Sequence, residues 1–156
     1  MSRIDSRIYV SKSIEDTFSF LNRCESHLDF IPRMIGLNQT SQGIFGRVGT
    51  TLSGVLNYFG IRIPVDYEII EIEPNQSLAM KGRMGPFLFK DGYILNTNGS
   101  GTEIRFWLDL LPTGWMKVFS PFLGLIGRIH AWETLRNLRR ELTKDEIASP
   151  SLHSSQ

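Results

Sequence analysis

Four polar side chains stand in otherwise apolar stretches, where they could move protons: Tyr67, Asp91, Tyr93 and His130. Asp91 lies in FLFKDGYIL, and strict strand alternation would turn its carboxyl group to the same side as Phe89 and Tyr93. A buried carboxyl has a raised pKa and can act as an acid or a base. The alternative is a β-bulge at Gly92 that rotates Asp91 to the solvent, and we favour this alternative.

The histidines give a less specific signal. His130 lies beside the apolar stripe of a C-terminal helix, where a packed core histidine is commoner than a functional one. We expect His27 at the surface, because no Cys, Asp or Glu stands beside it at metal-ligand spacing. With three separated histidines and the single Cys24, we expect no metal. Neither a GxSxG sequence nor a phosphate-binding loop occurs, so no cofactor is expected and Asp91 and His130 are the catalytic candidates.

Composition indicates one ordinary globular domain. The chain has 156 residues, 41% hydrophobic and 21% charged, with a net charge of +1. This balance favours neither DNA binding nor strong attraction to anionic surfaces. The N-terminus has no secretory apolar segment, so we expect a cytoplasmic protein. The domain should span residues 1–144, followed by a serine-rich disordered tail at 145–156.

Periodicity predicts an α+β architecture. An opening strand in RIDSRIYVSKS precedes two short helices, IEDTFSFLN and CESHLDFI, and Pro32 ends the second. Alternating segments follow, separated by short turns, and predict six or seven antiparallel strands. They include RVGTTLSGVLNY, IRIPVDYEI, SLAMKGR, FLFKDGYILN and TEIRFWLDLL. In the second of these, Ile61, Ile63, Val65, Tyr67 and Ile69 share one face.

A long C-terminal helix should cover the apolar face of the sheet between Pro112 and Lys144. Charges inside its apolar first half, at Lys117 and Arg128, argue against a membrane span. The predicted sheet-facing stripe is Leu125, Ile129, Trp132, Leu135, Leu138 and Leu142. The first half has a second apolar side, formed by Val118, Phe119, Phe122, Leu123 and Ile126. Its neighbour could be the short helices, a ligand or another surface.

This order of elements resembles the helix-grip fold of the START-like (SRPBCC) superfamily, in its polyketide cyclase/dehydrase-like and coenzyme Q-binding branch. The resemblance covers roughly residues 3–144, and it implies a curved antiparallel sheet wrapped around the C-terminal helix. The matching segments are SIEDTFSFLNRCESHLDFIP, GRVGTTLSG, YEIIEIEPNQSLAMKG and GTEIRFWLDLLPTG. These are structural patterns, and no catalytic signature can be transferred with them. Such proteins often keep a cavity between sheet and helix for an apolar ligand.

The resemblance therefore implies binding or transport of a small hydrophobic molecule, such as a lipid, a quinone or a polyketide-like aromatic. An enzyme of the cyclase/dehydrase kind is the alternative, with Asp91, His130 or a tyrosine moving protons. A third alternative is a transient membrane or ribosome contact, because residues 115–144 hold six Lys/Arg and two Glu. The expected ligand-binding residues are Ile63, Tyr67, Ile69, Phe87, Phe89, Tyr93, Phe106, Leu108, Phe122, Ile126 and His130. The oligomeric state is not predicted.

Overall fold

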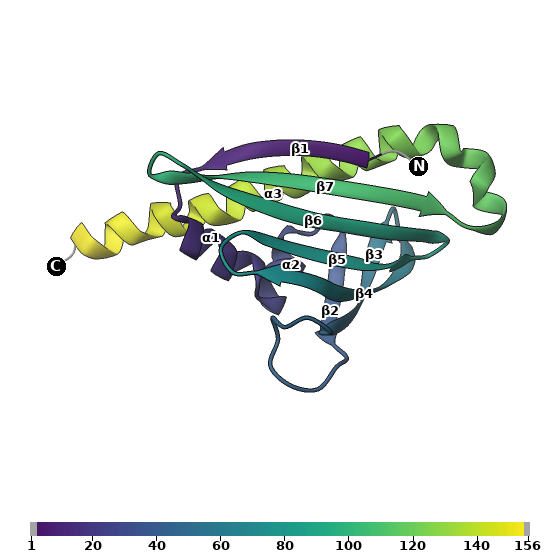
Figure 1. Ribbon diagram of the computed structural model, residues 1–156, viewed down its shortest axis with the longest axis horizontal. Helices are drawn as coiled ribbons and strands as arrows, with labels where there is room; N and C mark the ends of the chain where they lie inside the picture. Colours follow the sequence, from purple (N-terminus) through teal and green to yellow (C-terminus); the bar gives the residue numbers. More distant parts are fainter. Residues whose placement is uncertain (1–2, 155–156) are drawn as a thin grey trace.

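The computed structural model describes residues 3–154, with side chains described up to Lys144. Within these residues an antiparallel sheet of seven strands runs in the order β1-β7-β6-β5-β4-β3-β2, and α3 lies along it (Figure 1). The strands are β1 (Arg3–Val10), β2 (Met34–Gln39), β3 (Thr51–Tyr58), β4 (Ile61–Glu73), β5 (Ser77–Met84), β6 (Phe87–Asn98) and β7 (Gly101–Pro112). The helices are α1 (Ile14–Leu21), α2 (Cys24–Phe30), the 3₁₀ helix η1 (Gly114–Phe119) and α3 (Ser120–Ser154). The helix-grip prediction is confirmed.

The two short helices form as their sequences predict. Ser13 caps α1, and its Oγ accepts a hydrogen bond from the backbone N–H of Asp16 at 3.2 Å. Phe18 and Leu21 are buried on one face of this helix. α2 ends at Phe30, two residues before Pro32. Both helices lie beneath one end of the sheet in Figure 1, so they close that side of the core.

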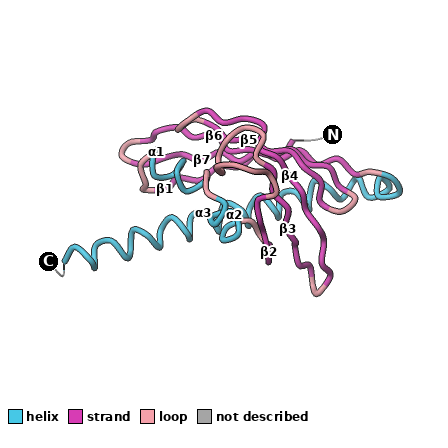
Figure 2. Tube along the Cα trace, turned by 90° about the horizontal axis from the view of Figure 1, so that it is seen from below, coloured by secondary structure: helices cyan, strands magenta, loops and turns pink. Residues whose placement is uncertain are grey.

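The sheet bends because its pairing shifts register twice, between Met34 and Gly36 on β2 and between Ile69 and Glu71 on β4. Figure 2 shows β2, β3 and β4 turning away from the plane of β6 and β7. β2 was not predicted individually, because it is a short edge strand with a glycine and a register shift. The curved sheet leaves a hollow on its concave side.

The buried face of α3 differs from the predicted stripe in its first half. Leu135, Leu138 and Leu142 are buried as expected. Leu125, Ile129 and Trp132 are exposed instead, by 59%, 48% and 59%, so that part of the prediction is wrong. The helix turns its small residues to the sheet: a Cβ at Gly127 would collide with Ile4 of β1 and would also contact Leu110 of β7. The inward face at this level is therefore Leu123, Gly127 and Ala131.

The C-terminal segment differs from one continuous predicted helix at its beginning. The chain first forms η1 and then α3, whose backbone continues to Ser154. The predicted disordered tail, residues 145–156, stays a prediction, because residues 155–156 and the side chains from 145 lie outside the described residues. Among the described helices, none is both long enough and apolar enough to span a bilayer.

Candidate functional site

A partly enclosed cavity lies between the concave face of the sheet and α3. The space open to the centre of a water-sized sphere is about 60 Å³, enough for a few water molecules. Its walls come from β2 to β7, from the segment after α2 and from α3. The residues lining it are Ile31, Met34, Leu56, Tyr58, Val65, Tyr67, Met80, Met84, Phe89, Asp91, Tyr93, Leu108, Leu110, Ile126, His130 and Thr134.

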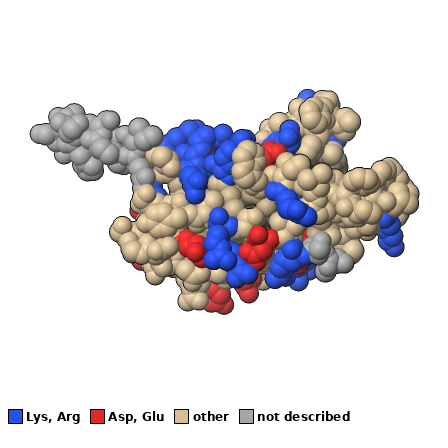
Figure 3. Space-filling view, turned by 90° about the horizontal axis from the view of Figure 1, so that it is seen from above, with Lys and Arg blue, Asp and Glu red and all other residues tan. Residues whose placement is uncertain are grey.

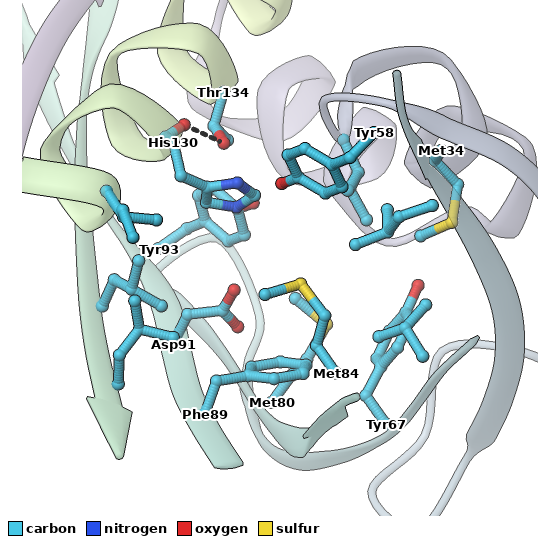
Figure 4. A pocket seen from close by; sticks show the side chains of 16 residues that line it. Met34, Tyr58, Tyr67, Met80, Met84, Phe89, Asp91, Tyr93, His130 and Thr134 are labelled. Carbon is cyan, nitrogen blue, oxygen red and sulfur yellow. Dashed lines mark hydrogen bonds between the residues drawn. The ribbon is translucent and has the colours of Figure 1, made fainter. Parts of the chain in front are cut away.

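Most of this lining is apolar, and part of it is adaptable. Three of the protein's five methionines, Met34, Met80 and Met84, lie on the cavity wall (Figure 4). A methionine side chain has three rotatable bonds and a polarisable sulfur, so it can move to fit guests of different shape. A few polar groups project into this apolar lining, an arrangement typical of small-molecule sites.

Asp91 is the most unusual of these polar groups. Its side chain points into the cavity (Figure 4), and the residue is only 8% exposed. Its Oδ1 atom has no hydrogen-bond partner among the described residues. Burial raises its pKa from 3.8 to about 7, because the charged form loses its hydration. The site therefore holds a carboxyl that changes charge near neutral pH.

The expected bulge at Gly92 is wrong. β6 keeps continuous register with both β5 and β7 across Asp91, so alternation carries its side chain inward. Gly92 serves a packing role instead. A Cβ on it would lie 2.8 Å from the ring of Trp107 and 2.8 Å from the carbonyl oxygen of Leu78. The glycine lets the Trp107 ring lie close against the outer side of the strand.

His130 projects from α3 into the cavity, near Tyr93 and Tyr58 (Figure 4). Burial lowers its pKa to about 4, and Arg33 contributes to this shift, so its imidazole is neutral at physiological pH. Burial also raises the pKa of Tyr93 well above its usual range. Thr134, one turn along α3, donates its hydroxyl to the backbone carbonyl of His130 at 2.7 Å.

Tyr67 is fixed by a second, fully buried histidine. His27 Nε2 lies 2.8 Å from the carbonyl oxygen of Leu21, and its Nδ1 lies 2.8 Å from the Tyr67 hydroxyl. A carbonyl only accepts, so Nε2 carries the proton and Nδ1 accepts from the tyrosine O–H. Burial lowers the pKa of His27 to about 4, which keeps the ring neutral. The Tyr67 oxygen consequently presents only its lone pairs to the cavity.

His27 was expected at the surface, and that expectation is wrong: its side chain is fully buried against Phe30, Phe45 and Tyr67. A helix of seven residues is too short for its periodicity to identify the inward side. The hydrogen bond by which His27 orients the Tyr67 hydroxyl was not predicted either. Nothing local in the sequence links these two residues, which are forty positions apart.

The structure brings six of the eleven predicted ligand-binding residues to the cavity: Tyr67, Phe89, Tyr93, Leu108, Ile126 and His130. The other five are outside its lining. Ile69 and Phe106 are completely buried in the core, with the Phe106 ring packed behind those of Tyr93 and His130. Ile63 and Phe87 are only partly buried, near the strand ends next to the β3–β4 and β5–β6 turns. Phe122 points outward and is 59% exposed.

Other lining residues were not predicted, among them Met34, Leu56, Tyr58, Met80, Met84 and Thr134. Alternation could have identified Met80 and Met84, which face the same side of β5. Met34 lies at the start of the strand that the pattern did not reveal. Its place on the wall depends on the bend of the sheet, which only the three-dimensional structure defines.

No protein-family model and no curated protein matches the sequence. Solved structures with a similar fold include the Zhui aromatase/cyclase from a Streptomyces species, with 9% identity and a TM-score of 0.78 over 92% of this chain and 94% of that chain. A START superfamily protein from Mycobacterium smegmatis has 14% identity and a TM-score of 0.74, covering 91% and 97%. A protein from Thermus thermophilus has 12% identity and a TM-score of 0.77, covering 92% and 99%. The likeness establishes a START-like helix-grip fold.

Proposed function

We propose that this protein binds a small, mostly apolar molecule in the cavity between its sheet and α3. The proposal rests above all on the buried carboxyl of Asp91, which points into an apolar, partly enclosed space. Its Oδ1 atom has no hydrogen-bond partner in the described part of the chain. Leaving a buried polar atom without a partner costs about 1–3 kcal/mol. A ligand atom that hydrogen-bonds to Asp91 would remove this cost and gain affinity in return.

The polar groups suggest what such a ligand carries. Tyr67 donates its own hydroxyl proton to His27, so its oxygen can accept a hydrogen bond from a ligand O–H or N–H. Asp91 in its neutral form can donate to a ligand carbonyl or hydroxyl oxygen. Ligands that meet these demands include a hydroxylated or quinone-like aromatic, a polyketide-like aromatic and a lipid with a polar end group. The space open to the centre of a water-sized sphere is only about 60 Å³, so we expect the methionine side chains to move when such a molecule binds.

A fluorescence titration with the uncharged probe N-phenyl-1-naphthylamine tests the proposal. We expect saturable binding that Met84→Trp weakens at least about tenfold, because the indole would occupy the cavity. Arg83→Trp is the matched control, because it places the same ring on the opposite, exposed side of β5. Equal binding by the two variants, or no saturable binding by the wild type, would contradict a cavity site.

Proton-transfer catalysis is a second candidate, since Asp91 and His130 both line the cavity and Asp91 titrates near pH 7. An aromatase/cyclase is among the proteins of similar fold. In such a step the Asp91 carboxylate would take a proton from carbon beside a ligand carbonyl, leaving an enolate that is reprotonated afterwards. Exchange of the acidic C–H of 2-tetralone with deuterated water measures this. Asp91→Asn should abolish any exchange above the uncatalysed rate. If the wild type exchanges no faster than the uncatalysed reaction, the catalytic proposal is wrong and only the ligand-binding proposal remains.

A further inference from the structure

One side of η1 and of the first half of α3 is apolar and faces the solvent. Trp115 and Val118 are more than 70% exposed, and Phe122, Leu125 and Trp132 are each 59% exposed. We name this set the outer apolar face. Its members are Trp115, Val118, Phe119, Phe122, Leu125, Ile126, Ile129 and Trp132. Isolated exposed apolar residues are normal, whereas large groups of them are typical of interaction sites. Trp115 packs edge-on against Phe119, with ring centroids 6.0 Å apart, and so joins η1 to the start of α3.

The face is a coherent stripe. At about 100° per residue, Phe122, Leu125, Ile126, Ile129 and Trp132 fall within an arc of about 120°. The residues that pack on the sheet, such as Leu123, Gly127 and Ala131, lie on the opposite side of the same helix. Apart from Ile126, which lines the cavity, no member of the outer apolar face belongs to the described core. Its side chains are 41% to 73% exposed, so the described residues leave most of the face open to the solvent.

Basic side chains surround and extend this stripe. Lys117 and Arg128 flank it, and the stretch from Trp115 to Trp132 contains no acidic residue. Arg136 stacks on the Trp132 ring at 4.5 Å and continues the stripe toward the C-terminus, followed by Arg140. Figure 3 shows a dense group of Lys and Arg along one edge of the molecule, and a surface with few charges toward the other end.

The two acidic residues on this part of α3 already have partners. Glu133 pairs with Arg33 of the segment after α2 at 3.4 Å. Glu141 pairs with Lys144 at 3.2 Å and with Arg140 at 3.7 Å. The electrostatic potential outside this part of α3 is therefore positive. The apolar side chains beside these cations include two tryptophans. This combination is characteristic of helices that lie in a membrane interface.

The face also reaches the cavity. Ile126 belongs to it, is 46% exposed and lines the cavity wall. His130, one turn further along α3, lines the same wall. A surface that covered the outer apolar face would therefore lie directly beside the cavity.

We propose that the outer apolar face, with Lys117, Arg128 and Arg136, docks on an anionic lipid surface. Apolar side chains enter the boundary between headgroups and acyl chains, and the cations contact the headgroup phosphates. A second copy of this chain suits the face less well. A twofold contact would bring the same cations of both copies together, while Glu133 and Glu141 are already paired within each copy. The docking does not depend on the cavity holding a ligand.

Co-sedimentation of the full chain with vesicles tests the proposal. The vesicles are phosphatidylcholine alone, or phosphatidylcholine with about one third phosphatidylglycerol, at about 0.15 M salt. We expect binding to the anionic vesicles only. Combining Trp115→Ser with Phe122→Ser should weaken it at least about tenfold, and so should combining Arg128→Glu with Arg136→Glu. Ile44→Ser and Arg62→Glu, at exposed positions elsewhere, are the matched controls and should leave binding unchanged.

Three results would overturn the proposal. The first is the absence of binding to either kind of vesicle. The second is binding that the arginine substitutions abolish and the aromatic substitutions spare, which would indicate a polyanion such as RNA as the partner. The third is a wild-type dimer in sedimentation velocity that the aromatic substitutions dissociate. Because the substituted side chains are exposed, circular dichroism should show all variants folded, so loss of binding reports on the face itself.

Discussion

Replacing Asp91 with asparagine should change how the stability of the protein depends on pH. The folded protein holds Asp91 neutral up to about pH 7, whereas its ordinary pKa is 3.8. Well below pH 3.8 the carboxyl is neutral in both states, so its ionisation does not affect the free energy of unfolding there. As the pH rises from 3.8 to about 7, the unfolded chain ionises first, so the wild type loses free energy of unfolding. Above about pH 7 the loss is complete.

The size of the effect follows from the shift. About three pH units at about 1.4 kcal/mol each amount to about 4 kcal/mol. The asparagine side chain of the D91N variant has nearly the same shape as aspartate and cannot ionise, so this variant does not undergo the loss. The free energy of unfolding of D91N, minus that of the wild type, should therefore rise by about 4 kcal/mol between about pH 4 and about pH 8.

Taking the difference between the two proteins removes the contribution of the histidines. His27 and His130 have pKa values lowered to about 4, so each makes the protein less stable as the pH falls from 6.5 toward 4. Both proteins share this loss. Urea unfolding followed by circular dichroism at several pH values gives the two curves, with Asp29→Asn, at an exposed position, as the control for removing one carboxyl. A difference that stays constant with pH would refute a buried, uncompensated Asp91.

Four further substitutions test other parts of the structure. Tyr67→Phe should lower the free energy of unfolding in urea by about 1–3 kcal/mol, because Nδ1 of buried His27 loses the hydroxyl that donates to it. An unchanged free energy of unfolding would mean that the pair does not form. Gly92→Ala should lower the free energy of unfolding by about 1–3 kcal/mol and shift the Trp107 emission to longer wavelength, because the added Cβ collides with that ring. An unchanged emission would contradict the contact. Leu138→Ala should lower the free energy of unfolding by about 2–5 kcal/mol, because Leu138 is buried, and Leu125→Ala by less than about 0.5 kcal/mol, because Leu125 is exposed. The reverse order would contradict the orientation of α3.

The architecture could be predicted from the sequence because its signals are local and repeated. A serine cap, a proline stop and alternation along β4 to β7 are each visible within a few residues. Alternation also predicts the inward side of Phe89, Asp91 and Tyr93 once the strand is taken as regular. Gly92 suggested a bulge because glycine often marks one, yet here it makes room for a ring on the neighbouring strand.

The parts that could not be predicted depend on contacts between distant segments. The inward side of α3 is set by the close approach of Gly127 to Ile4, and hydrophobic periodicity gives glycine no weight. The role of His27 depends on Tyr67, which a different element brings beside it. The sequence predicts the second apolar side of α3 but does not decide whether the short helices, a ligand or another surface covers it. The structure leaves most of that side exposed to solvent.

The most direct test of the cavity as a binding site is nuclear magnetic resonance of the protein labelled with ¹³C at its methionine methyl groups. Met34, Met80 and Met84 line the cavity, while Met116 lies in η1 beside the outer apolar face and acts as an internal reference. During titration with 1-naphthol, which has an aromatic body and one hydroxyl, we predict saturable shifts of the three cavity methyl signals and little change at Met116. Shifts at Met116 alone, or no saturable shift at the cavity methionines, would contradict ligand binding between the sheet and α3.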